Sequence, residues 1–537
     1  MKKIVVLSII GLLLGCKNEG SKSETNLRDI SEKSFRTFKV EDSKFINLDN
    51  FWAPFENQLS EFSPERYHRL EPLILNQDIP TIQKHIDNGK FNYETLVTFY
   101  LYRIKAFDRD NEKSLNSVIS LNPNILDQAR EMDKNRPSDL SNTSIYGMPI
   151  LLKDNINAKG LVTTAGAVAL MKNRTDDSFL SKQLKASGAL ILGKANLSEW
   201  AYFFCGDCPS GYSAVGGQTF NPYGRKSLDT GGSSSGSAVA VAANFCAAAI
   251  GSETSGSILS PSSQNGAVGL KPTVGTVSRS GIVPISSTLD TAGPISKYII
   301  DNVLLYNAII GYDSNDFKSK RVPNIDLEAI QTHHLKGKRF GAIQELMKDT
   351  LYATAIEILK SRGVEIVAVE PQKQDLPGFL RLLNLDMKTD LPLYFNKHAN
   401  VNLPYEGVQS IIDFNEKDSV ARAPYGQLLF RGIVADTAST QEFEDIKYTL
   451  KSNGRKYFND VMMRYRLDGL LSINNYHASY AAVAEYPALT VPMGLTEKGE
   501  PKGLTFIGKP FQESDLYTWG YVFEKFAKQR PEPFNYQ

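Results

Sequence analysis

The sequence predicts an α/β protein whose central sheet is covered by helices on both faces. Short apolar segments typical of buried strands alternate with amphipathic segments typical of helices. A helix–glycine–strand pattern also occurs twice, once in residues 179–192 and once in residues 354–369. Because no internal repeat and no long Pro/Gly linker follows residue 70, we expect one large domain.

The individual elements follow from local patterns. Helices are predicted at residues 79–106, broken in two by Asn88-Gly89, and at residues 125–132, 179–187 and 354–363. Strands are predicted at residues 147–154, 189–192, 339–343 and 364–369.

Composition narrows the class of protein. The 537 residues are 42% hydrophobic and 22% charged, which excludes a mainly disordered or fibrous chain. The 60 Lys and Arg residues against 59 Asp and Glu residues leave no surplus positive charge for a phosphate backbone, so we expect no nucleic-acid partner. Four cysteines are too few for a disulfide scaffold of this length.

The first residues predict export. Met1-Lys2-Lys3 is followed by an apolar or small stretch at residues 4–15, shorter than the roughly 20 residues that span a membrane, as in a signal peptide. It ends in Leu13-Leu14-Gly15-Cys16, which resembles the bacterial lipobox. We expect residues 1–15 to be removed, Cys16 to carry lipid, and residues 16–69 to form a tether and N-terminal extension. The protein would then lie in the bacterial cell envelope, anchored by lipid to a membrane and facing either the periplasm or the cell surface. A soluble secretory signal is the alternative.

Two Gly/Ser clusters, at residues 231–237 and 251–258, flank an apolar helix predicted at residues 238–243. A flexible linker would not run into a helix that has almost no polar residue. The clusters therefore indicate two backbone loops that approach a ligand closely.

Three chemistries suit such loops. A phosphate cradle at Gly188–Lys194 has the Walker A spacing, but Ala195 stands where Ser or Thr is needed, and we reject it. A Ser-His-Asp hydrolase could use Gly232–Gly236, which matches G-x-S-x-G but follows a polar segment instead of a strand. Its histidine would be His477, and its aspartate would be either Asp460 or Asp468.

The third chemistry is a serine activated by a neutral lysine. Lys153 ends the apolar strand that begins at Pro149. Burial disfavours the charged amine and lowers its pKa, so a lysine in this position could act as a base.

These segments together resemble the amidase signature family. The matching motifs are Lys153-Asp154-Asn155, the cluster at residues 231–237, Glu253–Ile258 and Gly269–Thr273. Ser233 and Ser257 are 24 residues apart, which is the spacing of the two serines in the family's Ser–cis-Ser–Lys triad. Residues 218–222, 383–395 and 411–416 lean toward the peptide amidase branch.

The resemblance implies a mechanism and a fold. Ser257 would be the nucleophile, Ser233 would follow a cis peptide bond and bridge Ser257 to Lys153, and Lys153 would be the base. The backbone N–H groups of Thr254, Ser255, Gly256 and Ser257 would form the oxyanion hole. The fold would be one α/β/α sandwich around a mixed, twisted sheet over residues 70–537. Neither a metal nor an organic cofactor is implied.

The implied substrate is a linear carboxamide on a small molecule or peptide, such as a C-terminally amidated peptide. Leu259 and Ser260 stand where many members carry arginine, which disfavours half-amides of small dicarboxylic acids. Two alternatives stay open: the amidase subunit of a tRNA-dependent amidotransferase, and a non-catalytic envelope binding protein on the same scaffold. For Cys205 and Cys208 we prefer a loop pair or local disulfide over half of a zinc site.

Overall fold

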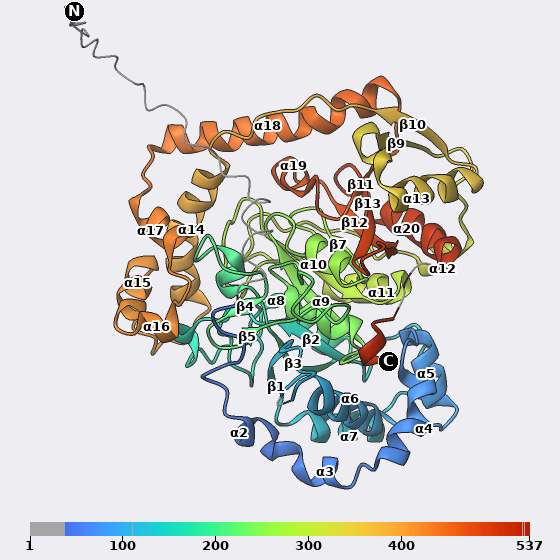
Figure 1. Ribbon diagram of the computed structural model, residues 1–537, viewed down its shortest axis with the longest axis vertical. Coiled ribbons are helices and arrows are strands. Elements are labelled where there is room, and N and C mark those ends of the chain that lie inside the picture. Colours follow the sequence, from blue (N-terminus) through green and yellow to red (C-terminus); the bar gives the residue numbers. More distant parts are fainter. Residues whose placement is uncertain (1–37, 110, 529, 531) are drawn as a thin grey trace, which may run out of the picture.

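A mixed sheet of eleven strands runs through the molecule in the computed structural model, which describes residues 38–109, 111–528, 530 and 532–537 (Figure 1). The strand order is β1-β3-β2-β6-β8-β7-β12-β13-β11-β9-β10. The strands are β1 (Val118–Leu121), β2 (Pro149–Lys153), β3 (Leu190–Ala195), β6 (Ala248–Glu253), β7 (Val268–Lys271), β8 (Thr291–Ser296), β9 (Arg339–Ile343), β10 (Glu365–Val369), β11 (Gly469–Ile473), β12 (Ala488–Leu495) and β13 (Pro501–Ile507). A separate hairpin pairs β4 (Tyr212–Ser213) with β5 (Gly217–Gln218).

The sheet combines both pairing directions. Strand β2 is parallel to β3 and β6, and β9 is parallel to β10 and β11. The pairs β6–β8, β7–β8, β12–β7, β12–β13 and β11–β13 are antiparallel. The predicted α/β class with a mixed central sheet is therefore confirmed.

Two groups of helices pack on the sheet. One group contacts the strands through α8 (Phe179–Ala186), α11 (Ile299–Ile309), α13 (Thr350–Ser361) and α20 (Glu513–Ala527), with α12 (Leu327–Thr332) against α20. The other includes α9 (Ser235–Ala242) and α10 (Leu259–Gln264). Every residue of α9 is buried, which explains why its sequence has no polar face.

The remaining helices lie around the sheet (Figure 1). The N-terminal set, blue in the figure, comprises α2 (Leu48–Trp52), α3 (Glu56–Ser60), α4 (Pro64–Ile74), α5 (Ile79–Asp87), α6 (Tyr93–Phe107) and α7 (Ile125–Lys134). The set drawn mostly in orange comprises α14 (Phe379–Lys397), α15 (Val408–Glu416), α16 (Ser419–Arg422), α17 (Leu428–Ala435) and α18 (Thr440–Arg464), with α19 (Ala478–Ala484) after β11. Single 3₁₀ turns are η1 (Ala53–Phe55), η2 (Val168–Leu170), η3 (Glu199–Tyr202), η4 (Gln344–Lys348) and η5 (Phe534–Tyr536).

The expected break between two N-terminal helices is confirmed by their caps. Asp78 caps α5 by accepting from the N–H of Thr81, and Asn92 caps α6 by accepting from the N–H of Thr95. Between them Gly89 adopts φ +65°, a left-handed conformation that ends α5. Local capping chemistry therefore explains why one amphipathic stretch forms two helices.

The described part of the predicted N-terminal extension packs on the main core. Residue 70, the predicted start of the main domain, falls inside α4. The described residues before it already belong to the main core, since Trp52, Phe55 and Phe62 are buried in it. Burial of these aromatic side chains fastens a segment whose sequence has little regular pattern.

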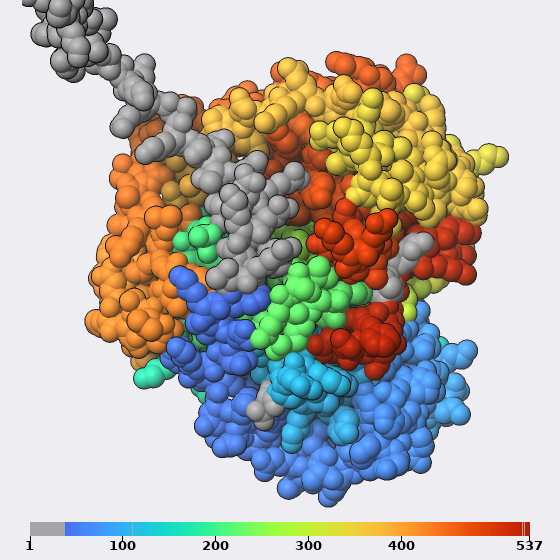
Figure 2. Space-filling model, viewed as in Figure 1, coloured from blue at the N-terminus to red at the C-terminus, as the bar shows by residue number. Residues whose placement is uncertain are grey.

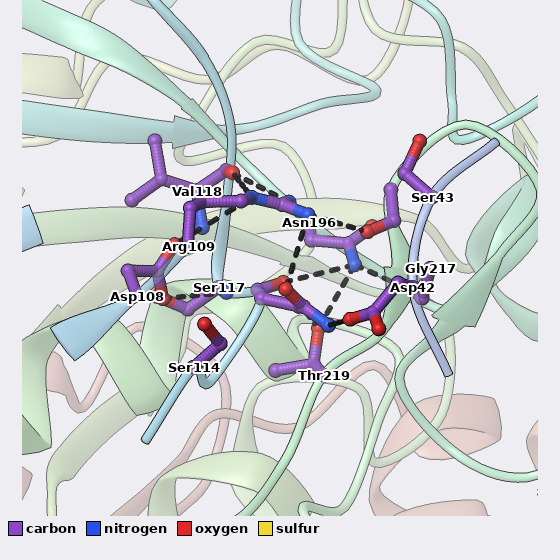
Figure 3. Close-up of polar contacts among 12 residues, drawn as sticks. Asp42, Ser43, Asp108, Arg109, Ser114, Ser117, Val118, Asn196, Gly217 and Thr219 are labelled. Atoms are coloured by element: carbon purple, nitrogen blue, oxygen red, sulfur yellow. Dashed lines mark hydrogen bonds and ion pairs between the residues drawn. The ribbon is translucent and has the colours of Figure 1, made fainter. Parts of the chain in front are cut away.

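Residues 39–43 enter the domain across the β4–β5 hairpin. The N–H of Gln218 donates to the carbonyl oxygen of Glu41 (2.7 Å), and the N–H of Lys39 donates to Tyr425 Oη (2.7 Å). Asn116 Nδ2 donates to Asp42 Oδ1 (3.2 Å). Figure 3 shows this entry segment beside a buried polar cluster that includes Asn196, Arg109 and Asp108.

The predicted signal peptide and Cys16 lie outside the described residues. In the part of the chain that the structure does describe, no helix has both the length and the apolar character needed to cross a bilayer.

Candidate active site

Lys153 lies at the carboxyl end of β2, completely buried. Its Nζ is 2.8 Å from Ser233 Oγ, 3.0 Å from the carbonyl oxygen of Ser252 and 2.9 Å from Ser252 Oγ. Asn155 Nδ2 also donates to Ser252 Oγ (2.9 Å). The amine is thus surrounded by hydroxyl and carbonyl oxygens, and none of these three contacts is a carboxylate.

Burial lowers the pKa of Lys153 to about 7, because an ammonium group loses its hydration in this position. The carboxylates of Asp290 and Glu253 oppose that shift by attracting the charged form. A substantial fraction of the lysine is therefore neutral at neutral pH.

Ser233 lies in the Gly/Ser loop before α9 and follows a cis peptide bond from Gly232. The loop is fastened on both sides: the N–H of Ser198 donates to the carbonyl oxygen of Ser233 (3.1 Å), and Ser234 Oγ donates to the carbonyl oxygen of Ser252 (3.1 Å). Ser233 itself has no exposed surface. These contacts hold its hydroxyl against Lys153.

A buried polar cluster around Asn196, drawn in Figure 3, is hydrogen-bonded to the start of α9. Asn196 Nδ2 donates to the carbonyl oxygen of Gly217 (3.1 Å) and to Thr219 Oγ1 (3.0 Å), while Asn196's backbone carbonyl accepts from the N–H of Gly236 (2.9 Å). A Cβ on Gly236 would overlap the carbonyl oxygens of Ser117 and Asn196. Glycine is required there because two backbones touch.

Ser257 lies in the loop between β6 and α10 and is 9% exposed. Its carbonyl oxygen accepts from the N–H of Ser234 (3.1 Å), so the two Gly/Ser clusters meet in space. Within the described chain, no hydrogen bond joins the hydroxyls of Ser233 and Ser257. The structure therefore brings Lys153 and Ser233 into direct contact and places Ser257 in the loop next to them.

Glu253 shapes the loop that carries Ser257. Its carboxylate accepts from the N–H groups of Gly256 (2.6 Å), Ile258 (2.7 Å) and Leu259 (3.0 Å). The expected oxyanion-hole donor at Gly256 is thus bonded to Glu253 in this structure. The N–H groups of Thr254, Ser255 and Ser257 remain from the expected set. The family motif contains Glu253, but its capping role could not be read from the sequence.

Asp290 holds the other side of the same loop. Its Oδ1 accepts from Thr254 Oγ1 (2.5 Å), and its Oδ2 accepts from the N–H groups of Ile285 (2.9 Å) and Ser286 (3.0 Å). Burial raises the pKa of this carboxyl. Sequence reasoning did not identify Asp290, Ser252 or Asn155 as parts of the site.

The residues of the other two chemistries have other partners. His477 Nδ1 is hydrogen-bonded to Ser472 Oγ (2.6 Å), and its ring stacks on Tyr457. Asp468, at the opposite end of β11 from His477, accepts from the N–H of Arg339 (2.8 Å). Lys194 belongs to β3 and pairs with Asp154 (2.9 Å), not with a phosphate loop.

Cys205 and Cys208 form a buried disulfide with a Cα–Cα distance of 5.9 Å. Both lie in an apolar cluster that also contains Trp200 and Phe430. The preferred interpretation, a local pair, is therefore the one that the structure shows.

The family described as Amidase matches residues 95–423, which include Lys153, both serines and the Gly/Ser loops. The chain belongs to the amidase family. A probable amidase of Arabidopsis thaliana is 34% identical over 480 residues, covering 86% of this chain and 92% of the relative. The chain is accordingly an amide hydrolase.

Two further similar proteins have names that indicate different substrates. The crystal structure of native peptide amidase from Stenotrophomonas maltophilia has a TM-score of 0.79 and 38% identity, over 86% of this chain and 98% of its own. One subunit of the glutamyl-tRNA(Gln) amidotransferase of Cereibacter sphaeroides is 30% identical over 452 residues, covering 77% of this chain and 90% of the relative. Members of one family thus carry different substrate names.

The site lies deep in the molecule. In the space-filling view, the green middle of the chain reaches the face shown between the blue N-terminal helices and the red C-terminal part (Figure 2). Lys153 and Ser233 are fully buried, and Ser257 is nearly so.

Proposed function

We propose that this amidase hydrolyses linear carboxamides through an acyl-enzyme on Ser257, with Ser233 relaying a proton to Lys153. The observation that carries the proposal is the contact between the buried Lys153 amine and Ser233 Oγ at 2.8 Å. A lysine whose pKa is lowered to about 7 can accept a proton at neutral pH, which an ordinary lysine cannot.

The three neighbours of Lys153 Nζ support the direction of proton transfer. A neutral amine has two hydrogens and one lone pair. The carbonyl oxygen of Ser252 can only accept a hydrogen bond, and Ser252 Oγ lies at 2.9 Å for the second. The lone pair is then left for the hydroxyl proton of Ser233.

The reaction follows from that arrangement. As Ser257 Oγ attacks the carboxamide carbon, its proton passes to Ser233 Oγ and the proton of Ser233 passes to Lys153. The N–H groups of Thr254, Ser255 and Ser257 would receive the developing oxyanion. The reversed relay protonates the leaving amine, and water then releases the acid from Ser257. The hydroxyls of Ser233 and Ser257 need to come into contact as substrate binds.

The substrate that we favour is a C-terminally amidated peptide or a similar linear amide. The 38% identity to a peptide amidase over most of both chains supports this choice. The confined position of Ser257 also suits a primary carboxamide, whose leaving group is ammonia.

The test combines labelling with turnover. Wild-type protein should react with a fluorophosphonate probe and release ammonia from an amidated dipeptide. Ser257→Ala should lose both, with residual kcat below about a hundredth, while Ser60→Ala on exposed α3 should keep both. Labelling of Ser257→Ala to the wild-type extent would remove Ser257 as the nucleophile. A wild type that neither labels nor turns over would overturn the proposed mechanism and substrate class.

The amidotransferase alternative makes a different demand. The 30% identity to one subunit of a glutamyl-tRNA(Gln) amidotransferase favours it, but such a protein works with partner subunits. Hydrolysis of an amidated peptide by the purified chain alone would exclude it. Failure of that hydrolysis, rescued by added amidotransferase partner subunits and tRNA, would support it.

We also propose that the protein is anchored to a membrane of the bacterial cell envelope through lipid on Cys16. The support is the sequence Leu13-Leu14-Gly15-Cys16 and the polar stretch at residues 17–26 behind it. Expression of wild type and Cys16→Ser in a bacterial host, followed by fractionation, tests the anchor. Equal membrane association of the two proteins would contradict it.

A further inference from the structure

The turn at residues 474–477 connects β11 to α19 and lies against the Ser257 loop. Asn474 adopts φ +48°, and both its backbone and its side chain bind β13: its N–H donates to the carbonyl oxygen of Gly503 (2.9 Å), and its Oδ1 accepts from the N–H of Gly503 (2.8 Å). Asn474 thus fixes the position of the residue that follows it.

That next residue, Asn475, faces the loop that carries the predicted nucleophile. Its Nδ2 is 3.1 Å from the position that a Cβ on Gly256 would occupy, and its own Cβ is 3.5 Å from the same point. Gly256 has φ +87°, a conformation that disfavours any side chain. The surface of the loop beside Ser257 is therefore lined by the Asn475 amide.

The Asn475 amide is partly buried and has no hydrogen-bond partner among the described residues. The neighbouring polar side chains differ: Asn474 bonds β13 and His477 bonds Ser472. A carboxamide offers two donor hydrogens and one acceptor oxygen. Because the side chain is only partly buried, its donors and its acceptor are available to a ligand bound beside the Ser257 loop.

We propose that Asn475 is a substrate-binding residue that hydrogen-bonds the peptide group next to the scissile carboxamide. A secondary amide presents one N–H and one C=O, which complement the oxygen and nitrogen of an Asn side chain. In an N-acylated amino-acid amide, only the Cα separates that peptide nitrogen from the scissile carbonyl carbon. The inference rests on the proposed function and specifies its substrate class as amides of N-acylated amino acids, including C-terminally amidated peptides.

A matched pair of substrates tests this assignment. N-acetyl-leucinamide carries the extra peptide group, and 4-methylpentanamide has the same branched acyl chain without it. Wild type is expected to favour N-acetyl-leucinamide by at least about tenfold in kcat/KM. Asn475→Leu, which keeps the approximate size and removes both polar groups, should lose about tenfold on N-acetyl-leucinamide, mainly through KM. It should change less than about twofold on 4-methylpentanamide.

Two further measurements make the outcome decisive. Asn475→Asp keeps the acceptor and removes the donors. Its kcat/KM on N-acetyl-leucinamide should therefore also fall below the wild-type value, while kcat/KM on 4-methylpentanamide is again unchanged. The rate of fluorophosphonate labelling should stay at the wild-type value in both variants, which shows an intact Ser257 loop.

Equal losses on the two substrates, or no loss on either, would overturn the role of Asn475 while leaving the amidase function in place. Failure of wild type to hydrolyse either substrate would instead overturn the proposed function itself.

Discussion

Two lysines on neighbouring strands are equally buried but are bound by different partners. Lys153 at the end of β2 contacts the hydroxyls of Ser233 and Ser252 and a carbonyl oxygen. Lys194 on β3 contacts the carboxylate of Asp154 (2.9 Å) and the hydroxyl of Thr163 (3.1 Å). Both side chains have no exposed surface, and burial lowers the pKa of both.

The difference lies in the carboxylates around the two amines. Asp154 directly opposes the loss of charge on Lys194, whereas the carboxylates that influence Lys153 act on it without a direct contact. One lysine can therefore be neutral at working pH while the other stays paired. Burial lowers the pKa of both lysines, but only Lys194 has a carboxylate in direct contact.

The largest effect is expected from Lys153→Ala. Loss of a positioned base should lower kcat/KM at pH 7 by about 10²–10⁴-fold. Part of the activity should return at pH 9, because hydroxide partly replaces the amine. The measurement is kcat/KM on an amidated dipeptide at both pH values, beside His477→Ala. An inactive His477→Ala together with an active Lys153→Ala would reverse the assignment.

Lys194→Met should mainly cost stability. Removing one partner of a buried ion pair leaves the Asp154 carboxylate unpaired, which typically destabilises by about 3–5 kcal/mol. Urea unfolding at pH 7 would measure the loss. The double variant Lys194→Met, Asp154→Leu should recover part of it. If Lys194→Met is as stable as wild type, the ion pair of Lys194 with Asp154 does not stabilise the fold, and the proposed contrast with Lys153 is wrong.

The pH dependence of wild type tests the neutral base. Because only neutral Lys153 accepts a proton, and its pKa is lowered to about 7, activity should fall as pH drops through that value. We expect kcat/KM to decrease roughly tenfold between pH 8 and pH 6 and to level off above pH 8. A midpoint near the ordinary lysine value of about 10.4 would contradict a neutral resting amine.

The smallest effect is expected from Asp290→Asn. The Asp290 carboxylate raises the pKa of Lys153, so its removal should move the midpoint of the pH profile to lower pH, by less than about one unit. Weakened support of Thr254 should also lower kcat severalfold. Other charged side chains contact residues 286–288, next to Asp290, among them Lys318, Asp386 and Asp390. They stay unchanged in this variant. A midpoint at higher pH would disprove the electrostatic role.

Local sequence patterns predicted the parts of the site that depend on neighbouring residues. The end of an apolar strand identified Lys153, and the Gly/Ser clusters identified the two loops of Ser233 and Ser257. The resemblance to the amidase family then assigned their roles. Asn155 and Ser252, within the recognised motifs, gained a role only when β2 and β6 were seen side by side.

Asp290 and Asn475 could not be predicted because their positions depend on strand order. Strand β8 lies next to β6 although β7 comes between them in the sequence, and the register pairs Glu253 with Thr291. Asp290 therefore lies opposite Thr254, from a segment that carries no motif recognised in the sequence. Trp52 and Phe55, which precede the predicted start of the domain at residue 70, likewise pack by tertiary contact and not by periodicity.

The entry segment at residues 39–43 is the first part of the described domain that a force applied at the N-terminus would reach. Its hydrogen bonds to Gln218 and Tyr425 come from parts of the chain far apart in sequence, and they precede every helix and strand of the described domain. If the chain is held at Cys16, a pulling force on the anchor reaches these bonds first. The strand that carries Lys153 is separated from that load, because β2 lies inside the sheet and pairs with β3 on one side and with β6 on the other.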